Sequence, residues 1–552
     1  MDLFGLAKRE LAALILRAHA ENAAEGLLPS APAAPAPPVA PPKEASHGDL
    51  ASAWALVCAK ALRLPPAEIA QKVVSRMELG GSMFRGVEAA PNGFINAAFA
   101  PGFYTKTLET ILDEGASYGR AAEKTGRRVL VEFVSANPTG PMTVGNARGG
   151  VLGDTLAACL EAAGHEVRRE FYLNDAGHQV DAFARSIECR YLQAFGLDAP
   201  MPDDGYMGEY IAEYARGYIA LHGDTLLPEP PETRRRELAA YALPLAVDNM
   251  RRDLERYRVR FDRWFAESEL HAAGDVEATV AELTRRGRTY EKDGALWLTA
   301  EGWDKDEVLR RANGFYTYFA SDLAYHRDKY ARGYHEIINI FGADHHGHTL
   351  RFPAALRALG LDSGKLRFVV MQLVSLTRGG EAARMSKRTG KAVTLADLLD
   401  EIGPDAARFF FNMRRPDNKL DFDLDLAVRH SADNPVYYVQ YAHARICTLL
   451  NTVQADPDPC AEGLTHAAET AAMRLLAAYP EEVALAASQY EPSGINRYLM
   501  ELAAAFHRFY DSCRLASAPQ PLKNRRAALC ACVRQTLANG LGLLGVTAPE
   551  KM

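Results

Sequence analysis

The stretch VLVEFVSANPTGPMTVGNARGGVLGDTLAACLEAAG, residues 129–164, constrains the fold of this chain more than any other feature. The apolar run 129–135 predicts a buried parallel strand. A turn rich in Asn, Pro and Gly follows, and an apolar-periodic helix is predicted to open at about Gly145. Free amide groups and the positive end of the helix dipole then face the end of the strand. The segment therefore predicts a nucleotide site in which Gly145 and Gly149 let the ligand approach the backbone.

The length of the chain predicts several domains, because single cores stop growing at about 250–300 residues and this sequence has 552. Its 48% hydrophobic and 24% charged content is ordinary for a globular protein, and no apolar run approaches a membrane span. The N-terminal residues 1–23 form an amphipathic helical pattern that contains acidic residues, which is not typical of a signal peptide. We expect a cytoplasmic protein with no membrane partner.

The cysteines and the net charge exclude some classes of protein. Eight dispersed cysteines without a CxxC pair predict neither a disulfide framework nor a structural zinc site, and no other protein-bound metal is expected. A net charge of −7 argues against non-specific nucleic-acid binding but leaves a local RNA-binding face open. On charge alone, an acidic metabolic enzyme would be favoured.

Composition and periodicity predict a multidomain α/β protein in three parts. Residues 1–115 form an α+β unit, in which the Pro/Ala tract 29–42 is interpreted as a tolerated loop. Residues 116–425 alternate strands and helices and predict a parallel sheet, with a mostly helical insertion at about 180–310. Residues 426–552 predict a helical bundle. The strands expected in the parallel sheet are 129–135, 166–173, 336–342 and 366–374.

Polar residues follow the expected strands. These are Ser135 and Asn137, Asn174 and Asp175, Asp322 after segment 316–322, and Asp344 to His346. Asp175 and Asp322 each precede helix-like stretches, so either could simply cap a helix. Four polar strand ends in one parallel sheet instead predict a ligand pocket.

The expected pocket is negatively charged. Glu132 lies within an apolar strand, where a lone carboxylate is costly unless it is paired. With Asp322 as a second carboxylate and Asn137 as an amide, the pocket suits a planar guanidinium. We therefore expect a cationic substrate.

A second phosphate-binding element is expected at ARMSKRTGK, residues 383–391. Its cations Arg384, Lys387 and Arg388 lie near several glycines, and such a loop can close over a triphosphate and stabilise charge on departing pyrophosphate. A solvated basic turn is the alternative for this loop taken alone. Together with the strand–turn–helix segment, it suggests nucleotidyl transfer.

Aromatic and basic residues are interleaved in the C-terminal helices. The residues that could contact RNA bases are Tyr437, Tyr438, Tyr441, His443 and Arg445, although most of this stripe is expected to be helical core.

These motifs together resemble a known family. ANPTGPMTVGN (136–146) resembles the HIGH signature of class I aminoacyl-tRNA synthetases, and RMSKR resembles their KMSKS loop. The surrounding sequence is closest to that of arginyl-tRNA synthetases. The segments that carry this likeness are YLNDAGHQ, VRFDRWF, TYFASDLAYHRDKY, GADHHGH, LDFDLDLA and NPVYYVQYAHARI. The resemblance spans nearly the whole chain.

The resemblance implies a Rossmann-type catalytic domain, an N-terminal domain that contacts the tRNA elbow and a C-terminal anticodon-binding domain. It implies that ATP, with Mg²⁺, and L-arginine give arginyl-adenylate, that the arginyl group passes to tRNA(Arg), and that adenylation needs bound tRNA. A monomer is the family default. The arginine-binding residues implied are Glu132, Ser135, Asn137, Tyr318, Asp322 and His345. The ATP-binding residues implied are Ala136, Pro138, Gly140, Gly145, Arg384, Met385, Ser386, Lys387 and Arg388. Thr143, Asn146 and Lys387 are expected to act in catalysis, and Tyr437, Tyr441 and Arg445 to contact tRNA.

One signature departs from the family pattern. Thr143 and Asn146 stand where the HIGH motif carries histidines, so neither position can supply a positive charge. This departure leaves open a paralogue that binds tRNA or arginine without charging. A cysteinyl-type ligase is a second alternative, but it would need a zinc site that the dispersed cysteines do not supply.

Overall fold

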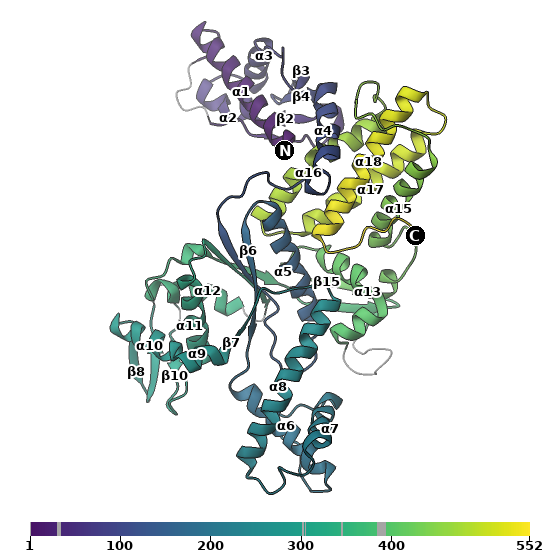
Figure 1. Cartoon of the computed structure of the whole chain (residues 1–552). Coiled ribbons are helices and arrows are strands. Elements are labelled where there is room, and N and C mark those ends of the chain that lie inside the picture. Colours follow the sequence, from purple (N-terminus) through teal and green to yellow (C-terminus); the bar gives the residue numbers. More distant parts are fainter. Residues whose placement is uncertain (1, 30–34, 301–302, 304, 344–345, 384–392) are drawn as a thin grey trace.

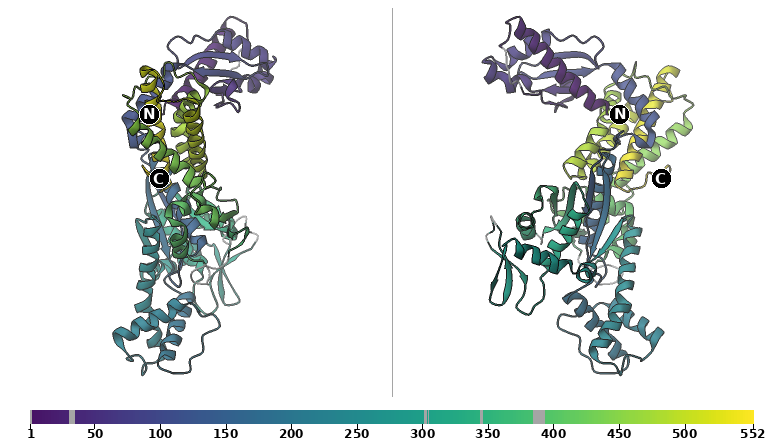
Figure 2. Two further views of the ribbon diagram at one scale, coloured as in Figure 1. Left: turned by 90° about the vertical axis from the view of Figure 1, so that its right-hand side faces the viewer. Right: turned by 60° about the vertical axis from the view of Figure 1, so that its left-hand side comes forward.

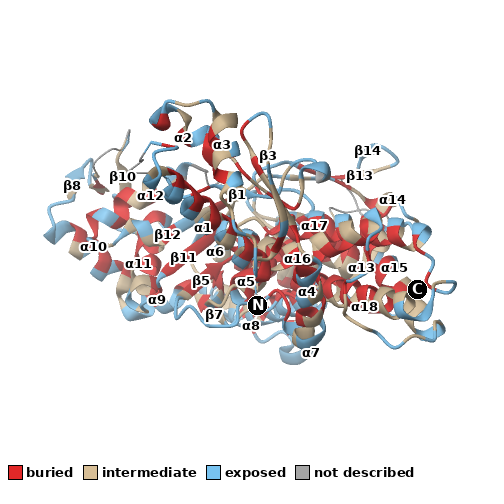
Figure 3. Cartoon of the chain, turned by 90° about the horizontal axis from the view of Figure 1, so that it is seen from above, coloured by how far each residue is buried: buried red, intermediate tan, exposed pale blue. Residues whose placement is uncertain are grey.

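The computed structural model describes residues 2–29, 35–300, 303, 305–343, 346–383 and 393–552. The molecule is elongated, with the N-terminal residues at one end, a helical insertion at the other and the main sheet between them (Figures 1 and 2). Buried residues concentrate on the interior helices and strands, whereas the connecting loops are largely exposed (Figure 3).

The N-terminal unit is an antiparallel sheet covered by helices, as predicted. Its strands lie in the order β1 (Val39–Ala40), β2 (Leu50–Ser52), β4 (Ile95–Phe99) and β3 (Phe84–Ala89). Its helices are α1 (Leu3–Ala24), α2 (Trp54–Leu62), α3 (Pro66–Ser75) and α4 (Pro101–Glu114). Leu11, Ile15 and Ala18 bury one stripe of α1, which gives this long helix a core-facing side.

The main sheet is wholly parallel. Its strands lie in the order β12 (Leu366–Met371), β11 (Glu336–Gly342), β5 (Arg128–Glu132), β6 (Glu166–Leu173) and β7 (Arg263–Ala266). Helix α5 (Val144–Ala162) connects β5 to β6 on one side, whereas α12 (His346–Ala358) connects β11 to β12 on the other. The chain thus leaves the centre of the sheet in opposite directions at β5 and β11, and such switch points are where open parallel sheets bind ligands.

The region between β6 and β11 is more varied than the predicted helical insertion. It contains α6 (His178–Ala194), α7 (Glu209–His222), α8 (Pro231–Arg256), α9 (Glu267–Ala273) and α10 (Asp275–Arg285). It also supplies β7, which the sequence analysis did not place, and an antiparallel sheet of β8 (Thr289–Lys292), β9 (Ala295–Leu298) and β10 (Glu307–Arg310).

Segment 316–322 is not a strand, and this expectation was wrong. Helix α11 (Tyr318–Ala331) begins at Tyr318, so Asp322 lies on its second turn and not at a strand end. Phe319, Ala320, Leu323 and Ala324 are buried on one side of this helix, and that helical spacing outweighs the β-prone start of the segment.

The C-terminal part is helical, as predicted. A small sheet of β13 (Val374–Arg378), β14 (Glu381–Ala382) and β15 (Leu420–Asp423) joins it to the part that holds the main sheet, through α13 (Leu395–Asn412) and α14 (Leu424–Ala427). The bundle is formed by α15 (Pro435–Thr452), α16 (Ala467–Ser488), α17 (Ser493–Ser512) and α18 (Gln520–Leu543). Helix α16 packs against α5 and also against α1 and α4, so the bundle joins the N-terminal unit to the main sheet. The boundaries proposed at residues 115 and 425 stay predictions.

Candidate active site

The central strand turns sharply where the site begins. β5 ends at Glu132, three residues before the predicted end, because Val134 (φ 68°) and Ser135 (φ 45°) adopt left-handed backbone conformations. That conformation costs a β-branched residue about 1–3 kcal/mol. Ser135 N–H donates to Phe133 O at 2.9 Å, and Ser135 Oγ donates to Glu132 Oε1 at 2.9 Å. The turn therefore folds Ser135 back over the last residue of the strand.

Glu132 is paired, as its place in an apolar strand requires. Lys329 of α11 donates to its Oε2, and the side chains of the two residues are only 0% and 5% exposed. Lys329 Nζ also donates to Asn339 Oδ1 of β11 at 3.1 Å and lies 4.1 Å from the centre of the Tyr325 ring. This contact joins α11 to the two strands at the switch point.

Asp322 is the second carboxylate of the site. Burial, and after it the negative charges of Glu132 and Glu267, together raise its pKa to about 8, against the opposing charge of Lys329. Near neutral pH, Asp322 therefore holds a proton that a bound cation would displace.

A cavity of about 390 Å³ opens at the carboxyl end of the sheet. Five of the six predicted arginine-binding residues line it, namely Glu132, Ser135, Asn137, Tyr318 and Asp322. Its other lining residues are Val134, Tyr172, Asn174, Gln179, Tyr325, His326, Ile340, Phe341 and Gly342. His345, the sixth, and Asp344 lie outside the described residues.

Several polar residues near the cavity were missed by the sequence analysis, namely Tyr172, Gln179, Tyr325 and His326, which line it, and Glu267. Gln179 of α6 lines the cavity and accepts a hydrogen bond from Asn137 Nδ2. Glu267 follows β7 and is 4% exposed, so the rule of polar strand ends would have found it had β7 been recognised. Asp175, in contrast, accepts hydrogen bonds from Ser268 N at 2.9 Å and Ser268 Oγ at 2.6 Å. It therefore accepts from the first turn of the distant helix α9, and it does not cap α6, the helix that it precedes, whose N-cap is Gly177.

The HIGH-like turn forms the start of α5. Thr143 is the N-cap and the helix begins at Val144, one residue before the predicted start. Thr143 N and Oγ1 both donate to Asn146 Oδ1 at 2.8 Å, and Asn146 N donates to Thr143 Oγ1 at 3.4 Å. This reciprocal capping box holds the first helical turn in place, with its remaining amides directed outward.

The predicted ATP-binding residues before α5 differ in accessibility. Gly145 is exposed, Ala136 and Gly140 are half-buried, and Pro138 is buried. A Cβ at Gly149 would lie an ordinary 3.7 Å from Met371 Cε, and the approach of a nucleotide to Gly149 stays a prediction. A Cβ at Gly153, in contrast, would lie 2.1 Å from Phe133 Cγ. Helix α5 therefore packs closely against Phe133, the residue that follows β5.

The RMSKR loop lies outside the described residues, and with it Arg384, Met385, Ser386, Lys387 and Arg388. The residues that follow it are described. Leu395 N donates to Met142 O at 2.8 Å, and Thr143 and Thr394 form an antiparallel bridge. The segment that follows the loop therefore contacts the HIGH-like turn directly.

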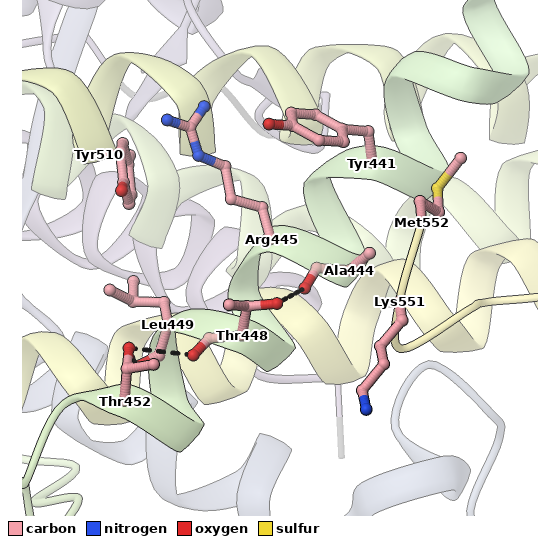
Figure 4. A pocket seen from close by; sticks show the side chains of 9 residues that line it. All are labelled: Tyr441, Ala444, Arg445, Thr448, Leu449, Thr452, Tyr510, Lys551 and Met552. Carbon is pink, nitrogen blue, oxygen red and sulfur yellow. Dashed lines mark hydrogen bonds between the residues drawn. The ribbon is translucent and has the colours of Figure 1, made fainter. Parts of the chain in front are cut away.

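A second cavity, of about 480 Å³, lies on the C-terminal bundle (Figure 4). Tyr441 and Arg445 of α15 line it, as do Tyr510, Lys551 and Met552, which the sequence analysis had not named. The Arg445 guanidinium lies 3.9 Å from the Tyr510 ring centre and 5.8 Å from that of Tyr441.

Tyr437 extends this surface. Its ring stacks on that of Tyr441, with centroids 5.9 Å apart and planes 7° apart. The predicted tRNA-contacting residues Tyr437, Tyr441 and Arg445 therefore form one ladder of flat side chains, of which Tyr441 is 38% exposed. Ladders of this kind bind nucleobases by stacking.

The described residues hold neither a candidate membrane span nor a candidate metal cluster. No helix there is long and apolar enough to cross a membrane. No group of three or more His, Cys, Asp or Glu side chains in the same residues is placed to hold a metal ion.

Comparisons with known proteins agree with this geometry. A sequence model described as the class I (R) catalytic domain of tRNA synthetases matches residues 107–203 and 209–430, so the chain is a class I aminoacyl-tRNA synthetase in its catalytic part. Models of the arginyl-tRNA synthetase N-terminal domain and of the DALR anticodon-binding domain match residues 11–99 and 439–552. The chain belongs to the arginyl-tRNA synthetase family.

Relatives and a solved structure support the same assignment. An arginine–tRNA ligase of Caldanaerobacter subterraneus is 46% identical and covers 99% of both chains. An arginine–tRNA ligase of Moorella thermoacetica is 46% identical over the full length of both. The structure of Thermus thermophilus arginyl-tRNA synthetase aligns with a TM-score of 0.76 at 23% identity, covering 99% of this chain and all of that one, which shows the shared fold.

Proposed function

We propose that this chain is an arginine–tRNA ligase. An arginine carboxylate oxygen attacks the α-phosphorus of ATP, pyrophosphate leaves with the electrons of the broken bond, and arginyl-adenylate forms. The 3′-terminal adenosine of tRNA(Arg) then takes the arginyl group and AMP is released. The observation that carries the proposal is the acidic cavity, which lies at the switch point of a class I sheet.

The acidic cavity is proposed to bind arginine. Glu132 supplies a carboxylate from β5, and Asp322 supplies one from α11. Hydrogen bonds to charged groups contribute about 1.5–3 kcal/mol each. Ser135 and Asn137 add polar groups from the turn after β5, and Tyr318 covers the mouth of the cavity with a half-exposed ring. His345 is proposed to lie nearby, on the basis of its position in GADHHGH.

ATP is proposed to lie across the start of α5. The backbone at Ala136, Pro138, Gly140 and Gly145 would support its adenosine and phosphates, and Thr143 and Asn146 would hold the first turn in place. Adenylation depends mainly on positioning and charge stabilisation, so no general base is needed.

The RMSKR loop is proposed to close over the phosphates. Lys387 would neutralise charge on the leaving pyrophosphate, helped by Arg384 and Arg388, while Met385 and Ser386 position the loop. The bridge between Thr143 and Thr394 supports this role, because it keeps the exit of the loop beside the helix start. Mg²⁺ would enter with ATP as part of the substrate.

The aromatic cavity on α15 is proposed to bind anticodon bases. Tyr437 and Tyr441 offer stacking surfaces, and Arg445 offers a cation and a planar guanidinium, within the part of the chain matched by the anticodon-binding model. We further propose that the enzyme acts as a monomer in the cytoplasm. The family membership supports charging, and no observation supports a paralogue that binds without charging.

Two assays test the proposal together. Purified protein is incubated with total tRNA, ATP and radiolabelled arginine, and ATP–pyrophosphate exchange is followed with and without tRNA. We expect arginine-specific charging, with exchange only when tRNA is present. Tight binding of tRNA(Arg) with neither charging nor exchange would contradict the proposal.

A further inference from the structure

Lys329 is a buried cation that the proposed reaction does not use. Its side chain has no exposure, and it does not line the cavity of about 390 Å³. Its ammonium group is held by Glu132 and Asn339, with the Tyr325 ring alongside. It therefore acts on a substrate through the residues that line the cavity, and its direct ion-pair partner among them is Glu132.

The position of Lys329 matters because the carboxylates around the cavity repel one another. Glu132 and Asp322 line the cavity, and the charges of Glu132 and Glu267 both act on Asp322. Desolvated like charges cannot all stay ionised without a cation between them. Lys329 is the buried cation in contact with Glu132, whereas the next cation on α11, Arg332, pairs with Glu170 at 2.5 Å and 2.8 Å.

We propose that Lys329 is a positioning residue for arginine recognition, which keeps Glu132 ionised and fixed in orientation although it does not touch the substrate. The inference rests on the proposed arginine site. Its consequence is that a bound arginine has to displace a proton only from Asp322. Without Lys329, Glu132 would also take up a proton in the empty cavity, and arginine would then displace two protons.

Every element around the pair contributes charged or titratable groups. These are Glu170 and Tyr172 of β6, Glu267 of α9, and Asp322, Tyr325, His326 and Arg332 of α11. The pair at Arg332 and Glu170 offers a matched control, because both ion pairs join α11 to the sheet but Glu170 does not line the cavity.

The test is calorimetric titration of the full-length protein with L-arginine at pH 7 in two buffers of different ionisation enthalpy, which counts protons released on binding. The parent is expected to release about one proton per arginine and Lys329→Met about two, because a second carboxylate must ionise. Arg332→Met is expected to release about one proton, like the parent. Equal proton release by Lys329→Met and the parent would overturn the inference.

A variant that does not fold still gives a result. If Lys329→Met is unfolded, the double variant Glu132→Gln/Lys329→Met should regain the parent's circular dichroism spectrum, since both buried charges are then absent. Failure of the double variant to fold would overturn the pairing. A parent protein that does not charge tRNA with arginine would instead contradict the proposed function, whatever the variants do.

Discussion

Thr143 and Asn146 cap the helix that carries the HIGH-like signature by hydrogen bonding to each other. Asn146 Oδ1 accepts both the backbone N–H and the hydroxyl of Thr143, and Thr143 Oγ1 accepts from the Asn146 backbone. The two positions that lack the family's histidines therefore have a defined structural role. They fix the helix start, and with it the direction of its free amide groups.

Removal of this cap tests the link between helix start and nucleotide. Thr143→Ala should lower the free energy of unfolding by about 0.5–2 kcal/mol and raise the KM for ATP, because the first turn frays. Asp2→Ala is the control, since Asp2 Oδ1 caps α1 by accepting from Gly5 N at 2.8 Å, far from the cavity. Chemical denaturation and ATP-dependent exchange measure both effects. An equal rise in the KM for ATP in both variants would contradict the prediction.

The protonation of Asp322 predicts a pH dependence for arginine. Because burial raises its pKa to about 8, the ionised form that binds a cation becomes more populated as the pH rises from 6 to 8. The KM for arginine should therefore fall over this range and level off above about pH 8.

Asp322→Asn should abolish this dependence. At pH 8.5 its KM for arginine should exceed the parent's by about 10- to 150-fold, which corresponds to the loss of one charge-assisted hydrogen bond. Asp328→Asn, on the same helix but outside the cavity, should retain the slope of the parent. Charging assays from pH 6 to 9 give both values. A slope that persists in Asp322→Asn would assign the titration to another group.

Lys387 should be needed for chemistry and not for arginine binding. Lys387→Ala should reduce ATP–pyrophosphate exchange by about 100-fold or more, the scale seen when one group that stabilises developing charge is removed. Calorimetric arginine affinity should stay at the parent's value. Lys305→Ala serves as the control, since Lys305 is an exposed lysine that does not line the cavity. Near-normal exchange by Lys387→Ala would remove Lys387 from this role.

Replacing an aromatic side chain of the cavity on the bundle with alanine should weaken anticodon binding. Tyr441→Ala should weaken binding of an isolated anticodon stem-loop of tRNA(Arg) by about 5- to 150-fold, the equivalent of one lost base stack of 1–3 kcal/mol. Tyr290→Ala is the matched control, because Tyr290 and Tyr441 are both 38% exposed. Fluorescence anisotropy measures the two affinities. Equal weakening in both variants would show a general surface effect.

The sequence predicted the chemistry of the site better than its geometry. Four sheet strands and the polar residues after them were visible in the local pattern, because apolar runs and turn residues are local signals. β7 was missed because it is short and follows the long helical stretch of α8, and Glu267 was lost with it. The left-handed turn at Val134 has no local signal, since valine rarely adopts that conformation.

The partner of Glu132 could not be found from the sequence at all. The cost of a carboxylate in an apolar strand predicted that a partner exists. Lys329, however, lies in a different element far along the chain, and only the docking of α11 against β5 brings the two residues together. The sequence analysis named Asp322 for its negative charge. It assigned Asp322 to a strand end and not to helix α11, because the docking of α11 against the sheet was not visible in the sequence.

The strand order also decides when the sheet can form during synthesis. One edge of β5 pairs with β6, which leaves the ribosome soon after it, but the other edge pairs with Glu336 to Asn339 of β11. At about 5–20 residues per second, the roughly 200 intervening residues take about 10–40 s to make. For that time the nascent chain carries an unpaired apolar strand edge, which is a template for aggregation. Slow translation between β6 and β11 would prolong the exposure, so the yield of folded enzyme should depend on the rate at which this stretch is translated.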